Sequence, residues 1–124
     1  MRAPEPLRGL RVVAAPTVLD ALPWPGGVVA LRLAPDDLFA LGAAGTELVG
    51  ALVEEEAGFV GWWFTPAELH DHVLEHIDWP LPAARPALAQ GLVAGVPARL
   101  WLTADRVLLF TAAAYAHELI DRLP

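Results

Sequence analysis

Four residue types are missing from this chain of 124 residues: serine, cysteine, lysine and asparagine. Serine and cysteine are the common covalent nucleophiles, while lysine forms Schiff bases and binds the phosphates of a P-loop. Their absence excludes serine and cysteine triads, disulfides, zinc ribbons and the P-loop. Threonine, histidine, the carboxylates, arginine and Tyr115 remain. The composition therefore favours a protein that is not an enzyme over a covalent catalyst.

Clustered basic residues and long apolar runs are missing as well. The net charge is −7 and the eight arginines are scattered along the chain, which argues against a nucleic-acid partner. No uninterrupted apolar stretch reaches about 18 residues, so we expect no membrane span. The first six residues lack the apolar run of a signal peptide, and the chain lacks cysteine. Together these features predict a cytoplasmic protein.

The residues that are present predict one globular domain over residues 1–124. The chain is 56% apolar and 19% charged, and proline and glycine divide it into short elements. We expect an α+β fold with a mainly antiparallel sheet, two main helices and a ferredoxin-like arrangement. Glu54, Glu55 and Glu56 are expected to form a solvated turn between two strands of a hairpin. The expected strands are residues 10–15, 28–33, 48–53, 59–64, 91–94, 99–102 and 107–110.

Two helices are expected, one in the middle of the chain and one at its end. Residues 65–68, Thr-Pro-Ala-Glu, have the pattern of a capping box with proline at the first helical position. This helix should end near Asp78, because the prolines that follow cannot continue it. The second helix should begin near Thr111. The residues expected on buried faces are Leu69, Val73 and Ile77 in the first helix and Tyr115, Leu119 and Leu123 in the second.

A possible metal site lies in the first of these helices. His72-x-x-Glu75-His76 fits the H-x-x-E-H pattern of inverted zinc peptidases, in which two histidines hold the metal and the glutamate serves as base. On a helical wheel, however, His72 and His76 flank the apolar stripe and Glu75 projects toward solvent, as on an ordinary amphipathic helix. We therefore expect no metal, and keep a small zinc-dependent hydrolase as an alternative function.

The tryptophans are the strongest candidates for contact residues. Trp62 and Trp63 are adjacent in an expected strand, so their side chains should point to opposite faces of the sheet. Either both faces are covered, or one indole faces a partner or ligand. Trp101 is expected on the same strand face as Arg99, opposite Leu100 and Leu102. The expected contact residues are Trp62, Trp63 and Trp101, with Gln90 as a polar anchor and Arg99 as a group for an anionic ligand.

Four segments follow, in order, the pattern of a known family. Residues 31–42 are similar to its Leu-Gly-Pro-Asp-Glu-Trp-Leu-Leu strand-turn-strand, and residues 65–81 to its Gly-Pro-Ala-Ala-Arg helix, which closes on Pro-Leu-Asp-Leu. Residues 89–91 and then 96–101 are similar to its Ala-Gln-Thr and Val-Pro-Val-Leu-Leu strands, and residues 114–119 to its closing Ser-Tyr-Ala-Glu-Tyr-Leu helix. In these segments the chain resembles the gamma subunit of heterotetrameric sarcosine oxidase, which has the folate-binding aminomethyltransferase-like fold.

The resemblance implies a non-catalytic relative, because the aspartate that the true aminomethyltransferases use has no counterpart here. It assigns no folate site to any residue, and it implies a partner oxidase or transferase subunit or a second copy of the chain. The sequence thus predicts an accessory or interaction module without a cofactor, which binds a protein partner or forms a homo-oligomer. A folate-like small-molecule binding protein is a second alternative to this function, beside the zinc hydrolase.

Overall fold

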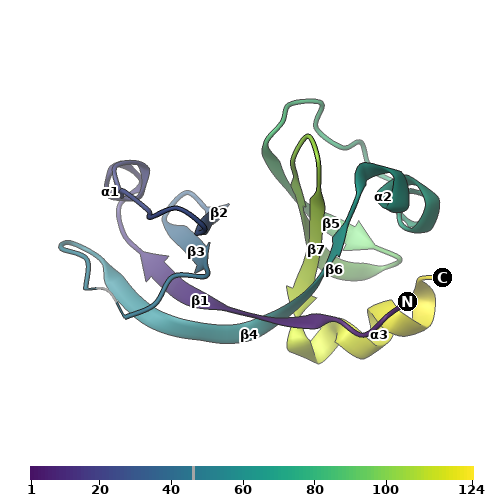
Figure 1. Cartoon of the computed structure of the whole chain (residues 1–124), viewed down its shortest axis with the longest axis horizontal. Helices are drawn as coiled ribbons and strands as arrows, with labels where there is room; N and C mark the ends of the chain where they lie inside the picture. Colours follow the sequence, from purple (N-terminus) through teal and green to yellow (C-terminus); the bar gives the residue numbers. More distant parts are fainter. Residues whose placement is uncertain (46) are drawn as a thin grey trace. The chain divides into compact units, whose positions relative to one another are not determined.

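The computed structural model describes residues 1–45 and 47–124. This part of the chain forms seven strands, three α-helices of five to seven residues and two 3₁₀ turns (Figure 1). Among the described residues, none of the helices has the length and apolarity that a membrane crossing requires. In chain order the elements are β1 (Glu5–Val13), α1 (Pro16–Asp20), β2 (Val29–Ala34), β3 (Asp37–Leu41), β4 (Leu52–Phe64), α2 (Pro66–His72), η1 (Leu74–His76), β5 (Ala87–Val93), β6 (Val96–Leu102), β7 (Val107–Ala112), η2 (Ala113–Tyr115) and α3 (Ala116–Arg122).

The strands follow the hydrogen-bonded order β2-β3-β1-β4-β7-β6-β5. The pairings of β1 with β3, β2 with β3, β4 with β7, β5 with β6 and β6 with β7 are antiparallel. The α+β class with a mainly antiparallel sheet is therefore confirmed. The chain divides into two compact units, one of Leu7–Gly58 and one of Met1–Pro6 with Phe59–Pro124. We call the second the C-terminal unit; the single domain expected over residues 1–124 stays a prediction.

The unit of Leu7–Gly58 contains an ion-paired arginine that joins two of its strands. Arg11 on β1 donates from Nε and Nη2 to the two carboxylate oxygens of Asp37 on β3, at 2.6 and 2.7 Å. Its Nη1 donates to Oε1 of Glu56 at 2.8 Å. The hydrogen bond to Asp37, followed by the one to Glu56, raises the pKa of Arg11. Such a bidentate pair fixes the relative position of the strands that carry it.

The prediction of a turn at Glu54, Glu55 and Glu56 was wrong: these residues lie inside a strand. Residues 52–64 form the single strand β4, where a hairpin of residues 48–53 and 59–64 was expected. Glu54 and Glu55 are exposed on this strand, whereas Glu56 is half-buried against Arg11. Glu54 and Glu55 reach water from within the strand, and the Glu56 carboxylate is paired with Arg11, 45 positions away. The acidic run therefore does not require a turn. The short helix α1 and the strand β3 were also not expected from the residue pattern.

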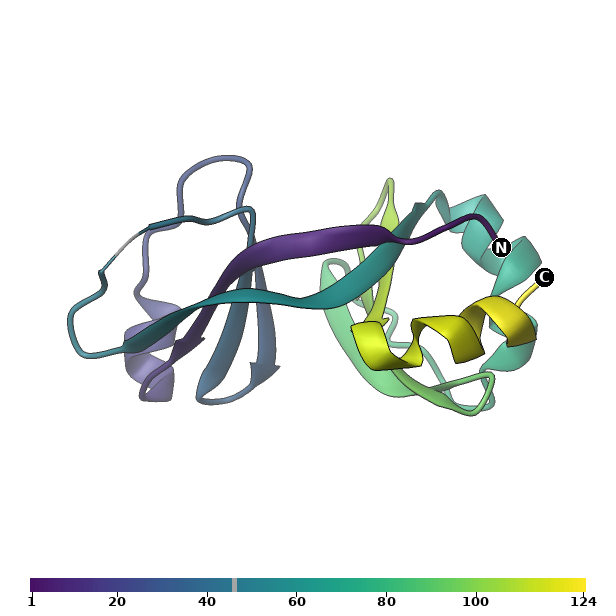
Figure 2. The ribbon, with the colours of Figure 1, turned by 90° about the horizontal axis from the view of Figure 1, so that it is seen from below.

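The C-terminal unit packs one sheet against two helices. Strands β4, β7, β6 and β5 are neighbours in that order, and α2 and α3 lie on the same side of this sheet (Figure 1). β5 and β6 are joined by a two-residue turn at Ala94 and Gly95, with φ of 49° and 79°, which suits a type I′ hairpin. Both ends of the chain lie at the same end of this unit (Figure 2). Its core contains Trp62, Phe64, Leu69, Val73, Ala89, Val93, Val96, Ala98, Leu100, Leu102, Val107, Leu109, Leu119 and Leu123.

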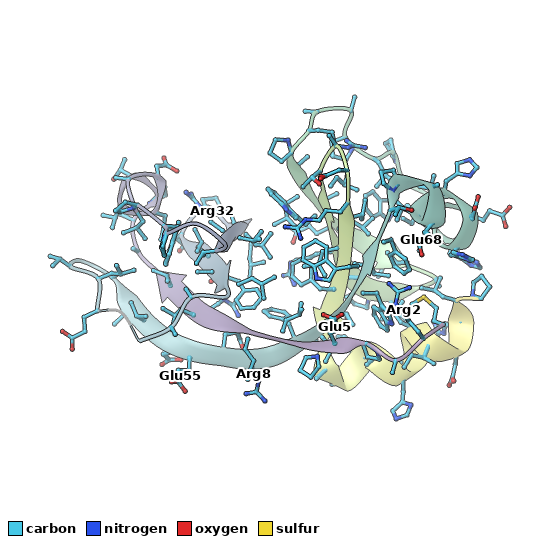
Figure 3. The ribbon with its side chains drawn as sticks, viewed as in Figure 1. Arg2, Glu5, Arg8, Arg32, Glu55 and Glu68 are labelled. Atoms are coloured by element: carbon cyan, nitrogen blue, oxygen red, sulfur yellow. The ribbon has the colours of Figure 1, made fainter. Side chains whose placement is uncertain are left out.

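The capping box predicted for the middle helix is confirmed. Thr65 N–H donates to Oε1 of Glu68 at 2.9 Å, and Glu68 N–H donates back to Oγ1 of Thr65 at 3.2 Å. The backbone N–H of Thr65, followed by its side-chain hydroxyl, lowers the pKa of the Glu68 carboxyl. Arg2 lies beside the same carboxylate, with Nη1 3.8 Å from its Oε2 (Figure 3). The cap thus fixes the start of α2, and its carboxylate lies within ion-pairing distance of the amino-terminal segment.

The helices are shorter than the sequence suggested. α2 ends at His72 and is followed by the separate 3₁₀ turn η1, although Leu69 and Val73 are buried as expected. At the end of the chain, β7 continues through Thr111, whose Oγ1 donates to the carbonyl oxygen of Pro97 at 2.8 Å. The α-helix therefore begins only at Ala116. Leu119 and Leu123 are buried as predicted there.

Candidate functional site

Four of the five expected contact residues lie on one face of the C-terminal sheet, opposite its core. They are Trp63 on β4, Gln90 on β5, and Arg99 and Trp101 on β6. Successive side chains of a strand alternate between faces, and the direct neighbours of these residues belong to the core. These core neighbours are Trp62, Phe64, Ala89, Ala98, Leu100 and Leu102. We call this surface the Trp101 face and define it by Trp63, Gln90, Arg99 and Trp101.

An apolar row crosses the Trp101 face from strand to strand. Trp63 is paired with Leu108, Leu108 with Trp101, and Trp101 with Leu88. Leu108 is fully buried in the middle of the row, whereas both tryptophans are half-buried. Directly paired side chains on one face contact each other, and aromatic and aliphatic pairs stabilise a sheet. The two indoles are therefore held in place by the sheet rather than by flexible loops.

A polar pair lies in the next row. Arg99 and Gln90 are directly opposite each other on β6 and β5, and Arg99 Nε donates to Oε1 of Gln90 at 3.2 Å. The guanidinium of Arg99 also lies 5.9 Å from the ring centroid of Phe59 on β4. Phe59 in turn contacts Phe110 edge to face, with centroids 5.6 Å apart. Arg99 is thus positioned by an amide on one side and an aromatic ring on the other.

The electrostatic character of this face differs from that of the whole chain. The four strand segments of the C-terminal sheet, residues 59–64, 87–93, 96–102 and 107–112, contain no carboxylate, although the chain has 15 acidic residues. The charged residue within these segments is Arg99, which is positive. Arg106, in the turn between β6 and β7, places its guanidinium 4.2 Å from a Trp63 ring centroid. The face therefore combines two cations with aromatic rings in a protein of net charge −7.

A shallow depression of about 450 Å³ adjoins the polar pair. Gln90 and Arg99 line it together with Leu92, Pro97 and Tyr115. The Leu92 side chain is 52% exposed and Tyr115 is 41% exposed, so the depression has an amphipathic wall. Aromatic, amide and guanidinium groups around an apolar floor are typical of surfaces that bind other molecules.

Trp62 does not belong to this face. It is 1% exposed, and its indole Nε1–H donates to the carbonyl oxygen of Arg2 at 2.8 Å. The adjacent tryptophans thus point to opposite faces as expected, with Trp62 in the core and Trp63 on the Trp101 face. Because a contact residue needs accessible area, the expectation that Trp62 contacts a partner was wrong.

Two aromatic residues lie near the site although the sequence pattern did not predict them there. Tyr115 was expected on the buried face with Leu119, but it lies in the 3₁₀ turn η2, whose tighter winding removes it from that face. Trp79 packs on the backbone of Gly91: a Cβ built at Gly91 would lie 2.6 Å from Cε2 of its ring. A glycine inside an expected strand is a signal for such a close approach.

The residues of the expected zinc motif lie on two different elements. His72 is the last residue of α2, and Glu75 and His76 belong to η1. The four-residue spacing therefore does not place the two histidines one turn apart on a continuous α-helix, as the peptidase pattern requires. Within residues 1–45 and 47–124, no three side chains of His, Asp or Glu are grouped closely enough to hold a metal ion.

Comparisons of this chain with protein-family models, curated proteins and solved structures returned no match. Any function assigned to the chain therefore rests on the residues described above.

Proposed function

We propose that this chain is a non-catalytic interaction module that binds a protein partner through the Trp101 face. The observation that carries the proposal is the common face of Trp63, Trp101, Arg99 and Gln90, which come from three strands of one sheet. Tryptophan and arginine dominate the residues that supply most of the binding free energy in protein interfaces. Their half-buried positions on a rigid sheet reduce the conformational entropy that is lost on binding.

The charges of the face define the partner that fits it. Arg99 and Arg106 lie beside aromatic rings on a surface whose strands carry no carboxylate. A partner surface with an apolar centre and acidic residues at its edge is complementary to this arrangement. The resemblance to the sarcosine oxidase gamma subunit supports the same proposal, because it implies an accessory subunit of the folate-binding aminomethyltransferase-like fold. The missing serine, cysteine and lysine nucleophiles support a role without covalent catalysis.

The proposal is tested by placing a photo-crosslinking amino acid at position 101 in cells of the source organism. We expect one protein species to be joined there and identified by its mass. Binding of that species, purified, should weaken by about 30-fold or more in the Trp101→Ala variant, as for a residue that supplies at least about 2 kcal/mol. Leu52, which is 73% exposed on β4, provides the control position and the control variant Leu52→Ala. Equal crosslinking at positions 52 and 101, or an unchanged affinity of Trp101→Ala, would contradict the proposal.

A small-molecule role is a second candidate, favoured by the depression beside Arg99. Its volume of about 450 Å³ falls in the range of about 300 to 1,000 Å³ found for ligand pockets. Arg99, Gln90 and Tyr115 offer guanidinium, amide and phenol groups to an anionic ligand. Titration with a tetrahydrofolate should then change the tryptophan fluorescence, because Trp101 is the second residue after Arg99 on the same strand face. The change should disappear in Arg99→Gln, and a flat titration of the unaltered chain at micromolar ligand would eliminate this candidate.

A further inference from the structure

Strand β5 forms one edge of the sheet, and part of its backbone faces outward. β5 pairs with β6 alone, and no strand follows it in the sheet order of the described residues. The carbonyl oxygen of Leu92 accepts a hydrogen bond from Trp79 Nε1 at 2.8 Å. The N–H of Ala94 donates to the carbonyl oxygen of His76, also at 2.8 Å. These contacts identify the residues whose backbone groups point away from β6. Because that direction recurs at every second residue of an antiparallel strand, the N–H and C=O groups of Leu88 and Gln90 point outward too.

This edge lacks the features with which proteins usually block strand pairing. Residues 87–93, Ala-Leu-Ala-Gln-Gly-Leu-Val, contain no charge and no proline. Among the described residues, Trp79 covers this edge at Gly91 and Leu92, and the carbonyl oxygen of His76 covers it at Ala94. Edge strands of stable monomers normally carry charges, prolines or bulges, because an open row of backbone groups invites another strand. In the part of the chain that the structure describes, the outward N–H and C=O groups of Leu88 and Gln90 and the N–H of Leu92 thus form an open pairing site.

The side chains along the edge are symmetric about Gln90. Leu88 and Leu92 stand two positions before and after it and share its face of the sheet, and Leu92 is 52% exposed. In an antiparallel pair of two identical strands related by a two-fold axis, the residue on the axis meets its own copy. With the axis at Gln90, Leu88 of each copy lies opposite Leu92 of the other. The leucines then form two apolar pairs, and the two primary amides lie face to face as mutual donors and acceptors.

From this symmetry we infer that this edge binds a second copy of this chain, through antiparallel pairing of the two β5 strands about Gln90. The inference goes beyond the proposed function, because the contact is made by the edge of β5 rather than by the Trp101 face. The two Gln90 residues exchange two backbone hydrogen bonds, and the N–H of each Leu92 donates to Leu88 of the other copy. Leu92 oxygen already accepts the Trp79 indole, so the N–H of Leu88 shares that acceptor. The pairing joins two C-terminal sheets edge to edge and continues the row of Arg99 and Gln90 from one copy into the other.

The natural absence of cysteine gives this inference a sharp test. Residues directly opposite in a hydrogen-bonded antiparallel pair have Cα atoms about 5.5 Å apart, which is within the range of about 4.4 to 6.8 Å for a disulfide. Under mild oxidation, Gln90→Cys should therefore form a disulfide-linked dimer. Leu92→Cys should not link to itself, because each Leu92 lies opposite Leu88 of the other copy, but it should link to Leu88→Cys in a mixture of the two. Leu52→Cys serves as the exposed control.

Sedimentation of the unaltered chain from micromolar to near-millimolar concentration completes the experiment. We expect a dimer with twice the chain mass of 13.3 kDa, that is 2 × 13.3 = 26.6 kDa. Gln90→Lys places two like charges across the axis, so the dissociation constant should rise at least about tenfold, whereas Leu52→Lys should leave it unchanged. A monomer at every concentration, open-ended growth beyond the dimer, or crosslinking of Leu92→Cys as fast as Gln90→Cys would overturn the inference. If the purified chain stays monomeric while position 101 crosslinks to a different protein, the inference fails and the proposed function stands.

Discussion

Replacement of Trp62 by alanine is expected to lower the free energy of unfolding by about 3 to 5 kcal/mol, the range for removing a large aromatic side chain from a core. Trp62 is among the largest side chains that are fully enclosed in the protein, at 1% exposure. Its indole also donates to the carbonyl oxygen of Arg2 at 2.8 Å, which ties the amino-terminal segment to the sheet. The variant loses this hydrogen bond in addition to the buried ring, so a value near the upper end is expected.

The adjacent Trp63 provides a matched control for this measurement. It has the same side chain on the same strand, but it is half-buried and lies on the Trp101 face. Urea denaturation followed by circular dichroism should give Trp63→Ala a loss of no more than about 2 kcal/mol, since only part of the ring is removed from a packed environment. Equal losses for the two variants would contradict the assignment of Trp62 to the core and Trp63 to the surface.

The contrast between these tryptophans shows which parts of the fold are encoded locally. Alternation along a strand predicts that Trp62 and Trp63 point to opposite faces and that Trp101 shares a face with Arg99. It does not predict which of the two adjacent indoles enters the core, because that depends on where α2 and α3 pack. The capping box at Thr65 is also a local signal, since its two hydrogen bonds join residues three positions apart. These local features were predicted correctly.

Interactions between distant residues account for most of the errors, and a local change of helix type accounts for the one at Tyr115. The acidic run was interpreted as a turn because nothing nearby neutralises Glu56, whose partner Arg11 is 45 positions away. Tyr115 was placed in the core because a helical repeat was extended through a turn that is in fact 3₁₀. The residues of the Trp101 face were predicted on their separate strands, but not as members of one common face. Its assembly from Trp63, Trp101 and Gln90 depends on the registers of three strand pairs, which no local pattern determines.

Replacement of Gly9 by alanine is the second change with a large expected effect. Gly9 lies on β1 opposite Leu41 of β3, and a Cβ built on its backbone would be 2.0 Å from the carbonyl oxygen of Ala40. This oxygen belongs to the backbone, which cannot rotate away as a side chain does. Strands β1 and β3 must therefore separate. Crowding in a packed interior costs about 1 to 3 kcal/mol and occasionally more, and a clash with backbone belongs at the upper end of that range.

Hydrogen exchange of the β1 and β3 amides locates this effect, since separation of the strands should accelerate exchange there before it does so in the C-terminal unit. Gly26→Ala is the control: among the described residues beyond its two chain neighbours, no atom lies within 4 Å of a Cβ at that position, and its φ is not positive. Reduced freedom of the unfolded chain should make this control neutral or more stable by up to about 1 kcal/mol. If Gly9→Ala were as stable as Gly26→Ala, the close approach of β1 to Ala40 would be wrong. A selective loss of protection in β1 and β3 would instead show that the register of Gly9 with Leu41 requires a residue without a side chain.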